Sequence, residues 1–126
     1  MDSGSTDELP VFDLDGVLRR LDQDTDLLRE LLSIFFAELP KLNDGIAAAL
    51  LGADLQGVIL NSHSLKGALT NVGAVRASDI ASKLEMAARK GEVEPLNSWS
   101  ESLKLELDKF ATEVARKGYR ECQAGN

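Results

Sequence analysis

Residues 63–74 read His-Ser-Leu-Lys-Gly-Ala-Leu-Thr-Asn-Val-Gly-Ala and lie within a long helical pattern. At about 100° per residue, Leu65, Leu69 and Val72 share the side of this helix opposite His63. An apolar stripe of this kind enters a protein core. We therefore expect a core-packed helix whose histidine, the only one in the chain, points to solvent.

Helical periodicity also governs the rest of the chain, and no segment alternates apolar and polar residues as a strand would. The pattern predicts a short helix over residues 13–21 and longer helices over 26–51, 55–71, 78–90 and 95–117. Short connections between these helices favour antiparallel neighbours. The predicted fold is all-α, an antiparallel up-down-up-down four-helix bundle with an additional short N-terminal helix.

Four residues help to define the ends and the course of these helices. Asp13 and Asp54 are suitable N-caps, and Gly73 can form the left-handed turn that ends the helix of His63. Pro40 lies inside the longest helix, where we expect a kink rather than a stop because the apolar spacing resumes beyond it.

The length of 126 residues and the share of 44% hydrophobic and 28% charged residues fit one globular domain. We expect the bundle over residues 10–118, a flexible leader or linker over 1–9 and a C-terminal tail over 119–126. The lone Cys122 excludes an internal disulfide and fits a reducing compartment.

The charge balance narrows the choice of partners. A net charge of −7 and a pI near 4.7 argue against binding to nucleic acid. The longest apolar runs are too short to cross a bilayer. We expect a cytoplasmic monomer whose partners are proteins.

The surroundings of His63 in the sequence are unusual for an acidic protein. None of the 21 acidic residues lies between Leu55 and Ser78, and Lys66 is the only cation within one turn of His63. A phosphoryl group on the imidazole would be repelled by carboxylates and steadied by a lysine. Gly67 costs about 1 kcal/mol relative to alanine in a helix interior, which suggests that space is needed there. The alternative explanation is that this helix, which is rich in small residues, lacks acidic residues by chance.

The segment resembles the signature of histidine-containing phosphotransfer (Hpt) domains, in which a histidine is followed by Leu-Lys-Gly at the second to fourth positions and by Gly-Ala at the tenth and eleventh. The resemblance extends over about residues 12–117. It includes the internal Leu39-Pro40 of the longest helix and the alanine-rich helix around Leu84-Glu85.

The resemblance implies that His63 accepts a phosphoryl group from a receiver-domain aspartyl phosphate and passes it to an aspartate of another receiver. Lys66 would assist the phosphoryl group, and Gly67 would leave room for it. Gln56 and Thr70, on the same side of the helix, are expected to support the site. The chain would then be a phosphorelay carrier and a substrate of its partners, not an enzyme. Those partners would be response-regulator receiver domains and a sensor or hybrid histidine kinase.

The chain itself offers few groups for phosphoryl transfer. A neutral imidazole is a competent nucleophile towards an activated acyl phosphate, with Nε2 as the expected attacking atom. Stabilising the transferred group requires a metal ion, and we expect the receiver to bring Mg²⁺. We expect no cofactor or metal bound by this chain, and the absence of a glycine-rich nucleotide loop argues against direct use of ATP.

Docking of a partner is expected to use Ile59 and Leu60, which place apolar area beside the imidazole. Leu14 and Leu18, on the short N-terminal helix, are further docking candidates, with simple core packing as the alternative.

Other classes of function fit less well. A hydrolase would need a carboxylate or nucleophile within a turn of His63, and a haem or metal bundle would need further inward-facing ligands. The remaining alternative is a non-catalytic helical interaction module, a degenerate Hpt domain that binds receiver or kinase domains without phosphotransfer.

Overall fold

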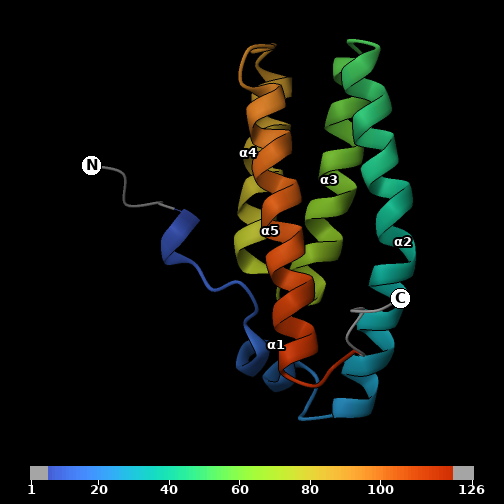
Figure 1. The fold of residues 1–126 in the computed structure, drawn as a ribbon, viewed down its shortest axis with the longest axis vertical. Helices are drawn as coiled ribbons and strands as arrows, with labels where there is room; N and C mark the ends of the chain where they lie inside the picture. The colour runs from blue at the N-terminus through green and yellow to red at the C-terminus, as the bar shows by residue number, and fades with distance from the viewer. Residues whose placement is uncertain (1–5, 121–126) are drawn as a thin grey trace.

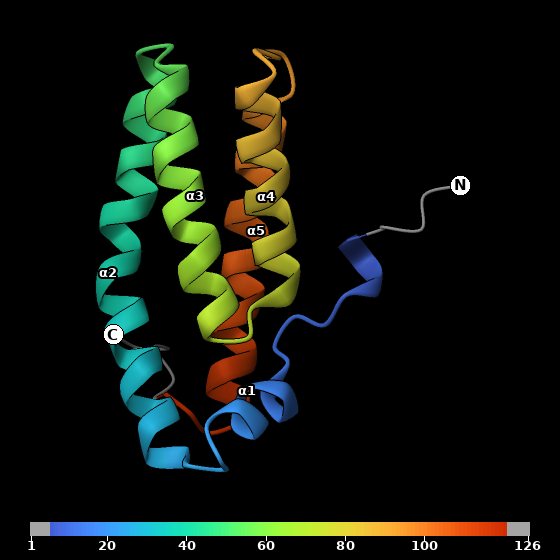
Figure 2. The same ribbon diagram turned by 180° about the vertical axis from the view of Figure 1, so that it is seen from behind.

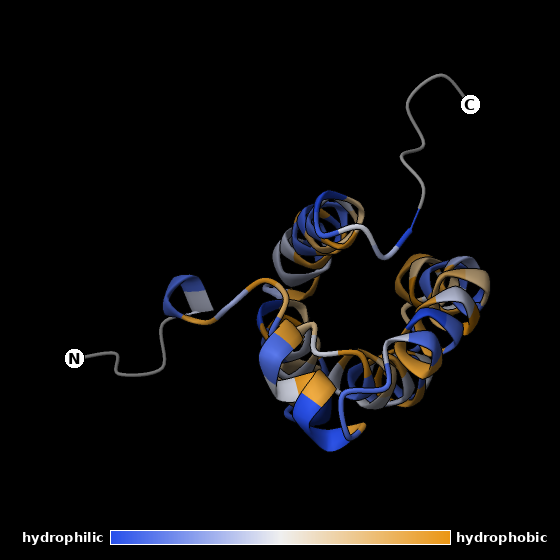
Figure 3. Cartoon of the chain, turned by 90° about the horizontal axis from the view of Figure 1, so that it is seen from below, coloured by the Kyte–Doolittle hydropathy of each residue, from blue (hydrophilic) through white to orange (hydrophobic). Residues whose placement is uncertain are grey.

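The structure, a computed structural model, describes residues 6–120 as a set of helices (Figure 1). The four long helices are α2 (Thr25–Leu51), α3 (Leu55–Asn71), α4 (Val75–Arg89) and α5 (Leu96–Arg116). Consecutive long helices run in opposite directions (Figure 2), and seen along their axes they surround a common centre (Figure 3). A short helix, α1 (Leu14–Arg20), lies at one end of the bundle. This is the predicted up-down-up-down bundle with a short N-terminal helix.

Local capping explains why the helices begin where the sequence predicts. The carboxylate of Asp13 accepts a hydrogen bond from the backbone N–H of Gly16 at 3.1 Å. The carboxylate of Asp54 accepts one from the N–H of Gly57 at 3.0 Å. Each bond satisfies an amide that the first helical turn leaves without a partner. Helix α2 continues through Pro40, as the resumed apolar spacing predicts.

The turn between α3 and α4 requires the predicted glycine. Gly73 has a φ of +78°, and a Cβ at this position would collide with the side chain of Val17 in α1. Its carbonyl accepts a hydrogen bond from the N–H of Asp13 at 2.8 Å. The turn is therefore tied to the start of α1.

Helix α4 begins at Val75, three residues before the predicted start at Ser78. Its N-cap is Ala74, which has no side chain able to accept a hydrogen bond, so the sequence carries no capping signal. The inner face of α4 is rich in small residues, with Ala77, Ala81 and other alanines buried. Small residues at a contact let two helices approach closely, and this helix packs directly against α3.

A cluster of aromatic rings joins α5 to α2 and to the segment before α1. The ring of Phe110 lies 5.3 Å from that of Phe12, 5.8 Å from that of Phe35 and 5.9 Å from that of Phe36. The ring of Tyr119, in the expected tail, lies 6.4 Å from that of Phe12. The folded part therefore extends past residue 118.

Residues 6–9, expected as part of a flexible leader, are folded against α4. Thr6–Glu8 form a single 3-10 turn, and Arg76 of α4 holds the carbonyl of Leu9 through its Nε at 3.1 Å. The sequence does not indicate this contact, because residues 6–9 are mostly polar and the donor, Arg76, lies in a helix far along the chain. Residues 1–5 and the tail from 121 onward, including Cys122, lie outside the described residues.

Candidate functional site

His63 projects from the middle of α3 with 62% of its side chain exposed. The opposite side of the helix supplies the core as predicted, since Leu65 and Leu69 are fully buried. The neighbouring Ser62 is also buried, and its hydroxyl donates to the carbonyl of Val58 at 2.6 Å. The imidazole therefore faces solvent, while the hydroxyl of Ser62 is turned inward and bound within the helix.

The sequence around His63 suggests a patch free of carboxylates, but the structure places one there. Glu85 of α4 places its Oε2 3.2 Å from Nδ1 of His63, with only 8% of the Glu85 side chain exposed. The sequence around His63 does contain no acid, but the carboxylate comes from the next helix, 22 residues later. The one feature of the sequence that could have pointed to Glu85 as part of the site is its position directly after the inward-facing Leu84.

Three basic groups surround the carboxylate of Glu85. Lys66 Nζ lies 3.2 Å from Oε1, Arg89 Nη2 lies 2.8 Å from Oε2, and His63 Nδ1 contacts the same Oε2. Burial by itself raises the pKa of Glu85, but the hydrogen bonds from Arg89, Lys66 and His63 outweigh it and hold the pKa below its ordinary value. Glu85 is therefore ionised at neutral pH.

An ionised carboxylate can only accept hydrogen bonds, so the Nδ1 of His63 must carry the proton that it donates to Glu85. The neutral imidazole then holds its free electron pair on Nε2. The arrangement selects one tautomer and leaves the ring with a nucleophilic Nε2.

Gly67 lies on the exposed side of α3, one turn beyond His63. A Cβ at this position would meet nothing within 4 Å. No contact inside the described structure therefore requires glycine there, although glycine weakens a helix interior by about 1 kcal/mol relative to alanine.

Gln56 and Thr70 are both exposed but lie at a distance from the imidazole. Each is seven residues from His63, which corresponds to about 10 Å along the helix axis. The hydroxyl of Thr70 donates to the carbonyl of Lys66 at 2.9 Å and lies 3.0 Å from that of Ser78. Neither side chain shares the cluster around Glu85.

The residues expected to dock a partner differ in exposure. Leu60 is 59% exposed beside the imidazole, whereas Ile59 is half-buried against the core. Leu14 and Leu18 of α1 are also half-buried and pack against the core. Of these four residues, Leu60 has the most accessible apolar surface.

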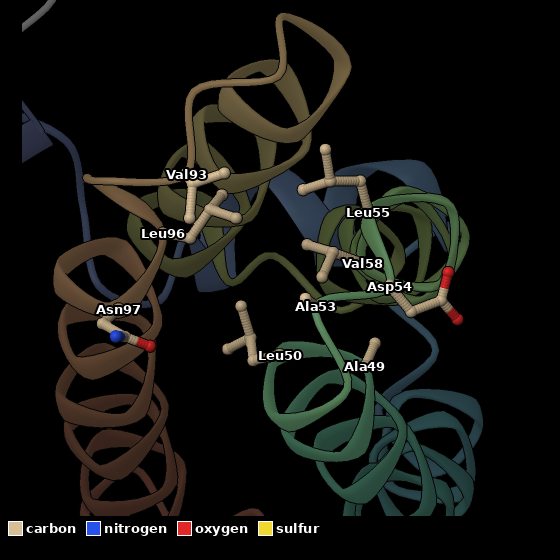
Figure 4. Close-up of a pocket in the computed structure, with 9 residues that line it drawn as sticks. All are labelled: Ala49, Leu50, Ala53, Asp54, Leu55, Val58, Val93, Leu96 and Asn97. Atoms are coloured by element: carbon tan, nitrogen blue, oxygen red, sulfur yellow. The ribbon is translucent and has the colours of Figure 1, made fainter.

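A separate apolar pocket lies at the end of the bundle away from α1 (Figure 4). Its walls come from the α2–α3 and α4–α5 connections and include Leu50, Val58 and Val93. Asp54, a polar residue in its lining, already caps α3. The carboxylate of Asp54 is thus already engaged in capping, and the lining of the pocket does not include His63.

Within residues 6–120, no three His, Cys, Asp or Glu side chains are grouped so that they could hold a metal ion. None of the helices described there combines the length and the apolar character needed to span a membrane.

The Hpt domain family matches residues 30–113, about two thirds of the chain, and the chain therefore belongs to this family. Members of the family carry phosphoryl groups in phosphorelays and interact with receiver domains and histidine kinases. The structure is similar to the crystal structure of histidine-containing phosphotransfer protein B (HptB) from Pseudomonas aeruginosa PAO1. The TM-score is 0.78 at 28% identity, covering 86% of this chain and 94% of that chain. No curated protein matches the chain significantly.

Proposed function

We propose that this protein is a phosphorelay intermediate in which Nε2 of His63 accepts a phosphoryl group from a receiver aspartyl phosphate. The observation that carries the proposal is the contact of Nδ1 with the ionised Glu85, which leaves Nε2 as the free nucleophile on an exposed ring. Membership of the Hpt family supports the same role.

In the transfer step, the electron pair of Nε2 attacks the phosphorus atom of the acyl phosphate. A nitrogen–phosphorus bond forms while the bond between phosphorus and the aspartate oxygen breaks, and the aspartate carboxylate leaves with that electron pair. The Nδ1 proton stays on His63, where Glu85 balances the positive charge of the phosphorylated ring. The reverse attack by a second receiver's aspartate returns the free imidazole.

Lys66 and Arg89 have different parts in this proposal. Lys66 lies one turn from His63 and is 34% exposed, so its ammonium group can turn from Glu85 towards the incoming phosphoryl oxygens. Arg89 contacts Oε2 of Glu85 through both Nε, at 2.9 Å, and Nη2. It therefore keeps the buried carboxylate paired and in place when Lys66 leaves.

In this proposal the receiver domain supplies the metal ion that stabilises the transferred phosphoryl group. Phosphoryl transfer needs cationic stabilisation of the equatorial oxygens, and Lys66 is the only basic side chain of the cluster that lies within a turn of His63 on its own helix. The Mg²⁺ ion belongs to the receiver in this scheme, so the chain acts as a substrate of its partners. Receiver domains and a sensor or hybrid histidine kinase are the proposed partners.

The proposal is tested by incubating the protein with receiver domains phosphorylated with labelled phosphate. Label stable to alkali and labile to acid should appear on the wild-type protein and be absent from His63→Gln. If no receiver transfers label while binding persists, the chain is instead an interaction module without phosphotransfer. If His63→Gln accepts as much label as the wild type, His63 is not the acceptor.

A further inference from the structure

An open groove lies between α3 and α4 next to the His63 site. Lys66, Gly67 and Thr70 line it from α3, and Ser78 lines it from α4. Leu9, from the segment that precedes α1, also lines it. The groove is therefore bounded partly by residues outside the four-helix bundle.

The segment that supplies Leu9 is held firmly against α4. We call residues 6–12 the N-terminal strap. Arg76 donates through Nη2 to the carbonyl of Asp7 at 3.2 Å, in addition to its bond to Leu9, and its own N–H donates to the carbonyl of Pro10 at 3.0 Å. Lys83 Nζ also contacts the Thr6 hydroxyl at 2.9 Å. These contacts tie the strap to α4, and it runs beside the N-terminal end of that helix (Figure 2).

The two helices that flank the groove differ in charge from the rest of the chain. Helices α3 and α4 contain four basic residues and two acidic ones, a net charge of +2 in a protein of net charge −7. The two acidic residues, Asp79 and Glu85, are both paired with lysines, at 3.2 Å. With Asp7 and Glu8 of the strap included, this surface has a net charge of zero, so it repels an anionic partner less than the rest of this acidic chain does.

We infer that a receiver domain docks over His63 and this groove together, so that the N-terminal strap forms part of the receiver-binding surface. The inference rests on the proposed function and adds the strap to the site. A standard interface of about 800 Å² per partner has a radius of about 16 Å. From His63 to the end of α3 at Asn71 is about 12 Å along the axis. One partner centred near His63 therefore reaches the Asn71 end of the groove, whose lining also includes Leu9.

The test compares Leu9→Asp with Leu51→Asp. Leu51 is 91% exposed at the far end of α2, so the second variant makes the same chemical change and the same change in net charge away from the groove. The receiver used is the one that transfers phosphoryl groups to the wild-type protein fastest. Binding is measured by calorimetry, and labelling of His63 by phosphoramidate, a small donor that needs no docking, is measured in parallel.

Leu9→Asp should raise the Kd for the receiver by at least about tenfold, because an apolar contact is lost and a negative charge is added. Leu51→Asp should leave the Kd unchanged, and phosphoramidate should label both variants at the wild-type rate. Equal Kd values for the two variants would overturn the inference and leave the proposed function intact. Failure of every receiver to transfer to the wild type, with phosphoramidate labelling preserved, would overturn the proposed function and the inference with it.

Discussion

Replacing Glu85 with glutamine should slow phosphoryl transfer because it removes the charge that selects the His63 tautomer. The amide keeps the shape of the side chain and can still accept a hydrogen bond from Nδ1. A hydrogen bond to a charged group contributes about 1.5–3 kcal/mol, compared with about 0.5–1.5 kcal/mol for a neutral pair. The difference of about 1–1.5 kcal/mol corresponds to about a tenfold loss.

Two measurements apply to Glu85→Gln. Nitrogen-15 NMR of the His63 ring should show a shift from a dominant Nδ1–H tautomer to a mixture. Single-turnover transfer from a phosphorylated receiver should slow by about tenfold. Glu113→Gln is the matched control, because Glu113 pairs with Arg116 on α5 in the same way but far from His63. A tautomer ratio and a rate equal to those of the control would refute the role of Glu85.

Three further perturbations act on His63 and the residues around it. Lys66→Ala should slow transfer by about tenfold without loss of helical circular dichroism, because Lys66 is on the solvent side of α3; unfolding would contradict this. Gly67→Ala should raise the free energy of unfolding by about 0.5–1 kcal/mol, since its Cβ meets nothing, while slowing transfer from receivers; a faster or unchanged transfer would show that the space is not used. The folded-state pKa of Glu85 lies below its ordinary value of 4.5, so its contribution to stability is present above that pH and is lost as pH falls through the lower folded value. Urea unfolding should therefore show wild type and Glu85→Gln converging in stability as the pH is lowered below 4.5, and a constant difference would contradict the ion-pair account.

The features that sequence reasoning predicts here are those with local causes. Asp13 and Asp54 cap their helices through amides three residues away, and Gly73 supplies a backbone conformation that other residues rarely adopt. The outward direction of His63 follows from the stripe of leucines on the other side of its own helix. Each of these depends on the order of nearby residues.

The features that the sequence does not predict depend on contacts between elements that lie far apart in the chain. Glu85 reaches His63 because the alanine-rich α4 packs closely on α3, and helical periodicity alone sets no register between two helices. The strap is polar and short, and its fold depends on Arg76, which is more than sixty residues away from it. Helix α4 starts earlier than predicted because Ala74 gives no capping signal.

The most direct test of the central claim is to locate the phosphoryl group on the protein. After transfer from a phosphorylated receiver, a correlation experiment between nitrogen-15 and phosphorus-31 reports which ring nitrogen of His63 carries the phosphorus. The account predicts phosphorus on Nε2 with the proton retained on Nδ1 beside Glu85. Phosphorus on Nδ1, or on any residue other than His63, would contradict it.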